Sequence, residues 1–75
     1  MRWLIVTFRT TEQALLMEEY CGRQGIPGRL VPVPPAIHAD CGLAFRTDPA
    51  GEEVFAARPA GMPEYDGLQL YDFRF

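Results

Sequence analysis

Apolar residues recur along the chain with two different periods, and together they predict four strands and two helices. Residues 3–8, WLIVTF, are apolar at both even and odd positions, which is typical of a central strand buried on both faces. Residues 28–33 form a shorter strand, and Pro32 marks it as an edge strand or as its end. Residues 41–46 predict a third strand, and residues 67–75 a last strand or an extended tail.

The segment between Thr10 and Gly25 has the spacing of an amphipathic helix. Thr10 is placed to cap its start, with Gln13 completing a capping box, while Gly25 and Pro27 end it. Leu15 falls outside the apolar arc. The arc is predicted to contain Ala14, Leu16, Met17, Tyr20 and Cys21.

A second, shorter helix is predicted over residues 49–58. Asp48 followed by Pro49 is a helix-start signal, and Gly51 weakens the helix that follows. The resulting order is β-α-β-β-α-β within a single domain, residues 1–75. This order predicts an α+β fold of ferredoxin-like type, a small sandwich in which both helices cover one face of the sheet.

The amino-acid composition and net charge indicate which classes of partner and which cell compartment to expect. Hydrophobic residues make up 48% of the 75 residues, enough for a folded domain with a thin core. The net charge is −3, lysine is absent and the arginines are scattered, so we expect no nucleic-acid or anionic membrane partner. No apolar run approaches the roughly 20 residues that span a bilayer, and the start lacks the features of a signal peptide. We therefore expect a cytoplasmic protein, in which the two cysteines are free thiols.

The candidate chemistry lies in residues 36–45, AIHADCGLAF. Cys41 follows a proline-stiffened connection and stands where a loop meets a strand, a usual place for functional groups. Gly42 would let a partner approach the sulfur closely, or let backbone N–H groups turn toward an anion. His38 or Arg46 could favour ionisation of the thiol.

A structural interpretation of the same residues stays open. Cys41 has the parity of Leu43 and Phe45, so within the strand it would be a small, inert core residue. Cys21 falls in the apolar arc of the first helix and is expected in the core; otherwise it is a second thiol, which could pair with Cys41 only if the Cα atoms lie within about 7 Å. His38 is alternatively a solvated loop residue.

The sequence gives little support for a metal site, a bound cofactor or catalytic turnover. Two cysteines and one histidine cannot close a four-ligand zinc site without borrowed carboxylates or a second chain. The acidic residues show no pairing that suggests general acid–base work. We expect no cofactor, no resident metal and no independent enzymatic activity.

The segments TFRTTEQAL, GIPGRLVPVP and DCGLAF, with the Asp-Pro step after them, resemble a family of small bacterial proteins described as Se/S carrier protein-like. The resemblance covers nearly the whole chain, and Cys41 corresponds to the cysteine of the family's Cys-Gly pair. It implies a carrier in sulfur or selenium metabolism, with a single thiol that holds a persulfide or selenosulfide between a donor and an acceptor protein. Cys21 is not part of the pattern, and the second helix here is shorter and richer in Gly and Pro.

Two alternatives come from other functional classes. One is a protein-interaction or regulatory module, which could form a homodimer through its short edge strands and its aromatic end, LYDFRF. The other is a metal-binding domain using Cys41 and His38, with Cys21 as a further ligand. An exposed Cys41 would favour the carrier, and a buried Cys41 the interaction module.

Overall fold

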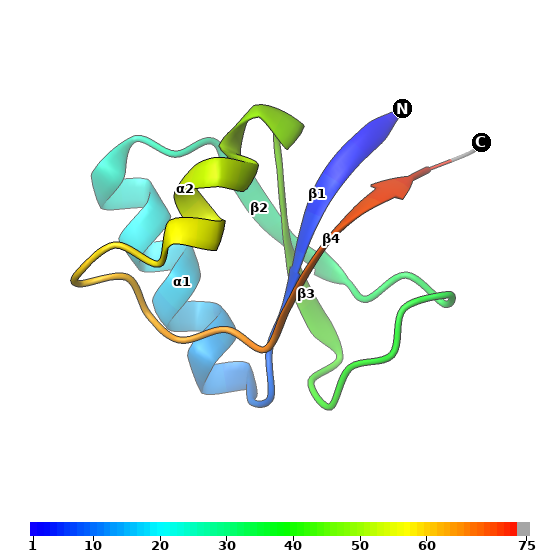
Figure 1. The fold of residues 1–75 in the computed structure, drawn as a ribbon. Coiled ribbons are helices and arrows are strands. Elements are labelled where there is room, and N and C mark those ends of the chain that lie inside the picture. Colours follow the sequence, from blue (N-terminus) through cyan, green and yellow to red (C-terminus); the bar gives the residue numbers. More distant parts are fainter. Residues whose placement is uncertain (74–75) are drawn as a thin grey trace.

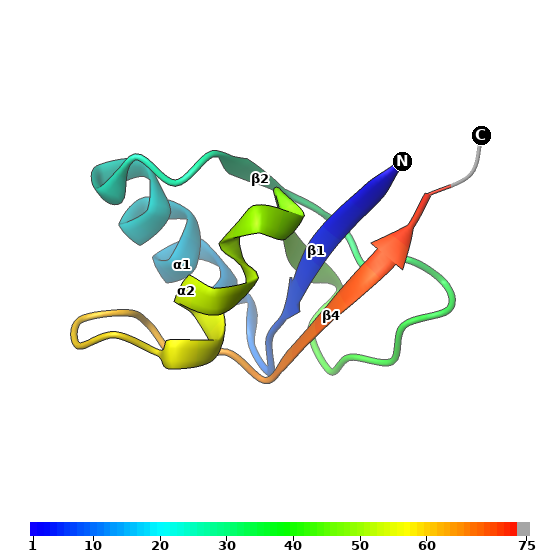
Figure 2. The ribbon, with the colours of Figure 1, turned by 45° about the horizontal axis from the view of Figure 1, so that its top comes forward.

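A computed structural model describes residues 1–73 as a four-stranded antiparallel sheet with its helices on one face (Figures 1 and 2). The strand order is β2-β3-β1-β4. Two β-α-β units interleave in it, because β3 lies between β1 and β2, and β1 lies between β3 and β4. The elements are β1 (Arg2–Thr7), α1 (Thr11–Gln24), β2 (Gly28–Pro32), β3 (Leu43–Thr47), the 3-10 turn η1 (Pro49–Gly51), α2 (Glu52–Ala57) and β4 (Gly67–Asp72). The predicted α+β ferredoxin-like fold is confirmed.

Strand β1 is central and buried on both faces, as its double-sided apolar pattern predicts. Leu4 and Val6 point to the helices, Ile5 points to the other face, and none of the three is solvent-accessible. Antiparallel pairing with β3 and β4 saturates both edges of β1. Strands β2 and β4 are therefore the edges. The predicted last strand ends at Asp72, and residues 74 and 75 of that prediction lie outside the described part of the chain.

The caps of α1 are largely those that the sequence predicts. The Thr10 hydroxyl accepts a hydrogen bond from the N–H of Gln13 at 3.2 Å, and Gly25 ends the helix with a φ of 72°. The second half of the capping box differs, because the Gln13 side chain accepts from the N–H of Arg9, not of Thr10. The Gln13 side chain thus still satisfies one backbone N–H just before the helix, that of Arg9.

The apolar stripe of α1 is narrower than predicted. Leu16, placed in the arc by its period, is 48% exposed, close to the 52% of Leu15. The other residues that face the sheet lie three, six and seven positions beyond Ala14. Leu16 lies about 200° around the helix from Ala14, outside this stripe. The buried residues are Ala14, Met17, Tyr20 and Cys21.

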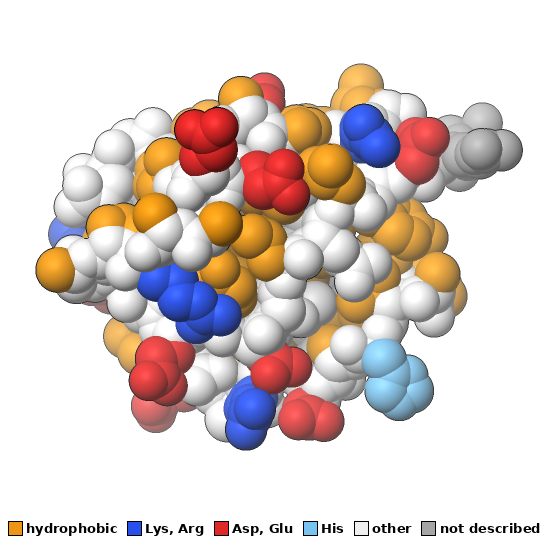
Figure 3. Space-filling model, in the orientation of Figure 1, with side chains coloured by type: hydrophobic (Ala, Val, Ile, Leu, Met, Phe, Trp, Pro, Cys, Tyr) orange, Lys and Arg blue, Asp and Glu red, His pale blue; other side chains and the backbone are white. Residues whose placement is uncertain are grey.

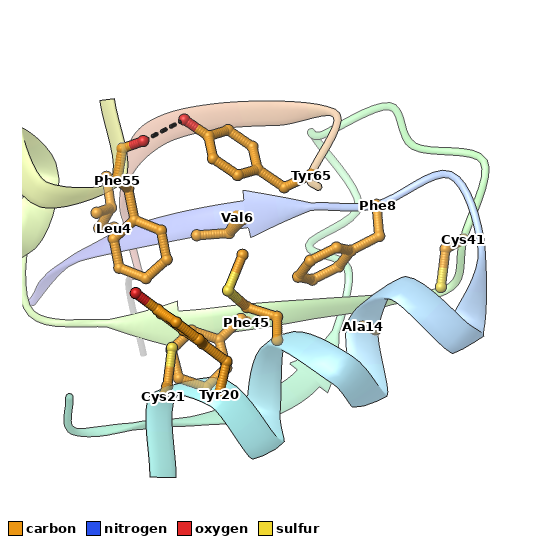
Figure 4. Packing of buried hydrophobic residues seen from close by; sticks show 11 residues of the cluster. Leu4, Val6, Phe8, Ala14, Tyr20, Cys21, Cys41, Phe45, Phe55 and Tyr65 are labelled. Atoms are coloured by element: carbon orange, nitrogen blue, oxygen red, sulfur yellow. Dashed lines mark hydrogen bonds between the residues drawn. The ribbon is translucent and has the colours of Figure 1, made fainter. Parts of the chain in front are cut away.

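Helix α2 is short and anchored by one aromatic residue. Asp48 caps its 3-10 start by accepting from the N–H of Ala50 at 2.8 Å, which confirms the helix-start signal. Phe55 is the buried residue of α2. The hydroxyl of Tyr65 donates to the carbonyl of Phe55 at 2.7 Å and ties the following loop to the helix (Figure 4). Arg58, in the left-handed conformation, ends α2 just before the predicted stop.

The core has two parts, one on each face of the sheet. The main cluster lies under the helices and includes Phe8, Phe45 and Phe55 (Figure 4). The smaller one lies on the opposite face, where the loop of residues 33–42 places Ile37 against the sheet. Partly buried apolar residues surround this smaller cluster, namely Trp3, Val33, Tyr71 and Phe73.

Candidate functional site around Cys41

Cys41 lies in the loop before β3, outside the strand that was predicted to begin with it. Its N–H donates to the carbonyl of Phe8, just after β1, at 3.2 Å. The carbonyl of Gly42 accepts from the N–H of Val33 at 3.0 Å and closes the base of the loop. Antiparallel pairing explains the geometry, because β1 ends at the same end of the sheet where β3 begins. The Cys-Gly pair is therefore held beside the start of α1.

Two polar groups contact the sulfur of Cys41. The N–H of Leu43 donates to Sγ at 3.4 Å. The hydroxyl of Thr11, the first residue of α1, lies 3.7 Å from Sγ and can donate to it. Both contacts lie beside the N-terminal end of the 14-residue helix α1.

The thiol is nevertheless covered. Cys41 is 5% exposed and belongs to the main core cluster. Gly42 beside it is exposed, and a Cβ built on Gly42 would meet no atom within 4 Å. The space on the Gly42 side is therefore open, next to the covered thiol in the chain.

Cys21 occupies a different environment. It is 1% exposed near the C-terminal end of α1, and burial raises the pKa of its thiol to about 11. It lies ten positions beyond Thr11, which is about 15 Å along the helix. The two sulfurs are at opposite ends of α1 (Figure 4), and both cysteines are free. This conformation does not bring Cys21 to Cys41 as a resolving partner.

The raised pKa of Cys21 makes part of the stability sensitive to alkaline pH. The unfolded thiol loses its proton near 9.0, and the folded thiol keeps it to about 11. Because the folded state binds more protons in this window, the stabilisation is complete below pH 9 and is lost toward pH 11, by on the order of 2 kcal/mol. Urea unfolding of the natural protein and of Cys21→Ala, at about pH 8 and about pH 11, measures this. Between these two pH values the natural protein should lose about that much more stability than Cys21→Ala does. If the two proteins lose equal amounts, the raised pKa of Cys21 is contradicted.

Of the three supporting residues predicted from sequence, Gly42 adjoins Cys41 in the chain, but His38 and Arg46 do not contact the thiol. His38 is exposed in the loop, and within residues 1–73 it forms no hydrogen bond or ion pair. Arg46 lies on the other face of the sheet, with its guanidinium 4.4 Å from the centre of the Trp3 ring. The side chain that contacts the Cys41 sulfur is that of Thr11. Sequence reasoning missed it, although its position directly after the N-cap of a helix that follows the central strand was the available signal.

Metal ligands and membrane-spanning helices were also sought among the described residues. Residues 1–73 contain no group of three or more His, Cys, Asp and Glu side chains that could hold a metal ion. Within the same range no helix has both the length and the apolar character to cross a bilayer.

Comparison with known families adds to this geometry. Residues 3–57 match the family described as "Putative Se/S carrier protein-like". The chain belongs to this family. The match confirms the resemblance seen in the sequence, and it spans β1 through α2, including both cysteines. No curated protein and no solved structure was found to match. The Se/S carrier-like family name suggests the carriage of selenium or sulfur, which implies donor and acceptor proteins.

Proposed function

We propose that the protein carries a single sulfur or selenium atom on Cys41, between a donor and an acceptor protein. The observation that carries this proposal is the contrast between its two thiols. Cys41 has two polar groups directed at its sulfur, from Leu43 and Thr11. Cys21 has none within residues 1–73, and burial raises its pKa. Among the described residues, hydrogen-bonding groups reach the sulfur of Cys41 and not that of Cys21, which supports Cys41 as the carrier thiol.

The transfer balances without an added oxidant or reductant. The Cys41 thiolate attacks the terminal sulfur of a donor persulfide, and its electron pair forms the new S–S bond. The old S–S bond breaks, and its electron pair leaves with the donor as a thiolate. An acceptor nucleophile later attacks the same terminal sulfur, and the Cys41 thiolate is the leaving group. A terminal selenium atom moves by the same two exchanges.

Access requires the loop of residues 33–42 to open locally. This loop contains no helix or strand. It is held by Ile37 and Val33, which pack with Ile5 and Ala44, by the burial of Pro34, and by the backbone bonds that Cys41 and Gly42 make. A loop without regular structure opens at lower free-energy cost than the helices and strands, while the rest of the fold persists. Opening exposes Sγ without dismantling the core around Cys21.

Alkylation of the folded protein tests this proposal. At neutral pH, Cys41 should react with iodoacetamide while Cys21 stays unlabelled, as peptide mapping would show. Ile37→Ala removes the main apolar contact of the loop and should speed the labelling of Cys41 by about tenfold or more. Leu16→Ala, which truncates an exposed apolar side chain, is the matched control and should leave the rate unchanged.

Cys21 serves as an internal monitor in the same experiment, since it becomes reactive only when the core opens. Equal labelling rates for the two cysteines in the natural protein would mean that Cys41 is reached only by global unfolding. That result would overturn the carrier proposal.

A protein-interaction module without covalent chemistry is the second candidate. The 5% exposure of Cys41 favours it, because a residue so well buried is usually structural. In that case Cys41→Ala would still bind the partner proteins that the natural protein binds. Under the carrier proposal, Cys41→Ala loses the exchange of sulfur with a donor.

A further inference from the structure

A cavity of about 340 Å³ lies at the end of the sheet remote from Cys41. It is formed where β1 and β2 begin and β3 ends. The residues lining it are Trp3, Pro27, Gly28, Arg29, Arg46 and Asp48. This volume is larger than one small inorganic ion needs.

Two arginines face each other in this cavity. Arg29 on β2 pairs directly with Arg46 on β3, so their side chains leave the same face of the sheet. Like charges directly opposite each other destabilise a sheet unless something neutralises them. Within residues 1–73 neither guanidinium forms an ion pair. The one acidic group in the lining, Asp48, directs an oxygen to the N–H of Ala50 at the helix start.

Arg46 also carries an unmet hydrogen-bond donor. Its Nε is buried and has no partner among the described residues. A buried donor without a partner is rare in folded proteins and costly. The guanidinium is held in place because it lies over the Trp3 ring, 4.4 Å from the ring centre. The Arg46 guanidinium is thus fixed before any ligand arrives.

We infer that this cavity, the Arg29–Arg46 site, binds a phosphate-type anion, either inorganic phosphate or the phosphate group of a small organic molecule. A carboxylate has two oxygens and is satisfied by one guanidinium fork. A tetrahedral anion has enough oxygens to accept from two guanidinium groups that come from different strands. The site carries two positive groups against one carboxylate, and the remaining volume accommodates an organic portion. It lies on the opposite face of the sheet from Cys41 and is independent of the carrier function.

Fluorescence of Trp3, the only tryptophan, tests the inference directly. The full chain is titrated with inorganic phosphate, with phenyl phosphate and with acetate, at constant ionic strength. We expect a saturable change with both phosphates, and with acetate only at much higher concentration. Tighter binding of phenyl phosphate than of inorganic phosphate identifies an organic phosphate as the ligand class, and equal binding identifies the free ion.

Variants complete the test. Arg46→Gln and Arg29→Gln should each weaken phosphate binding by about tenfold or more. Arg23→Gln is the matched control, because Arg23 is exposed on α1, pairs with Glu19 at 3.4 Å, and should leave binding unchanged. Arg29 is exposed, so Arg29→Gln remains informative if Arg46→Gln fails to fold. A change that does not saturate, or that all three variants weaken equally, would overturn the inference.

Discussion

Cys41→Ser should abolish loading with sulfur or selenium and leave the fold intact. A serine hydroxyl forms no persulfide and takes no part in thiol exchange. It can still accept the hydrogen bond from Leu43 and meet the Thr11 hydroxyl, so the site stays satisfied. Loading is measured by intact mass after exposure to glutathione persulfide, and folding by circular dichroism and urea unfolding. We expect the mass gain to vanish and the free energy of unfolding to fall by about 1 to 2 kcal/mol at most.

Cys21→Ala is the matched control for this variant. It removes the other thiol from the opposite end of α1, which lowers stability through lost packing but should leave loading unchanged. A folded Cys21→Ala protein that no longer loads would show that the two cysteines act together. Unfolding of Cys41→Ser would show that Cys41 is structural.

Phe45→Ala should remove much of the stability of the domain. Phe45 is 1% exposed on β3 and lies opposite Leu30 on β2 and Val6 on β1. Its ring also meets that of Phe55, with centres 6.3 Å apart. Truncating a buried Phe to Ala typically costs about 3–5 kcal/mol, and a domain of this size is stable by only about 4–11 kcal/mol. The urea midpoint should fall accordingly.

Leu15→Ala provides the comparison for Phe45→Ala, since it truncates an apolar side chain that is 52% exposed. Its free energy of unfolding should stay within about 0.5 kcal/mol of the natural value. A loss below about 1 kcal/mol for Phe45→Ala would contradict the assignment of Phe45 to the centre of the core.

Most of the fold could be predicted from local patterns. The double-sided apolar run gave the central strand, and Thr10 and Gly25 marked the ends of α1 correctly, because caps depend on neighbouring backbone groups. Two predictions were wrong: Leu16 is exposed although it was expected to be buried, and β3 begins at Leu43 instead of Cys41. Which part of a helix meets the sheet, and where pairing begins, are set by tertiary contacts that a period of 3.6 or 2 does not contain.

The site was only partly accessible to sequence reasoning. The Cys-Gly pair at the loop–strand junction drew attention to Cys41, but its contact with Thr11 joins residues 30 positions apart and depends on the fold. The strand pattern itself places Arg46 on the face opposite Cys41, because Arg46 lies five positions from Cys41 and alternates with the inward-facing Phe45. Predicting the Arg29–Arg46 site would need the pairing register between β2 and β3, which the two strand patterns alone do not fix.

Mapping of the carried atom tests the central claim most directly. The folded protein is exposed to glutathione persulfide, its free thiols are blocked, and the cysteine peptides are identified by mass. The account predicts one added sulfur atom on the peptide that contains Cys41, none on the peptide that contains Cys21, and release of that sulfur to cyanide as thiocyanate. A folded protein that gains no sulfur on Cys41, or gains it equally on Cys21, would contradict the account.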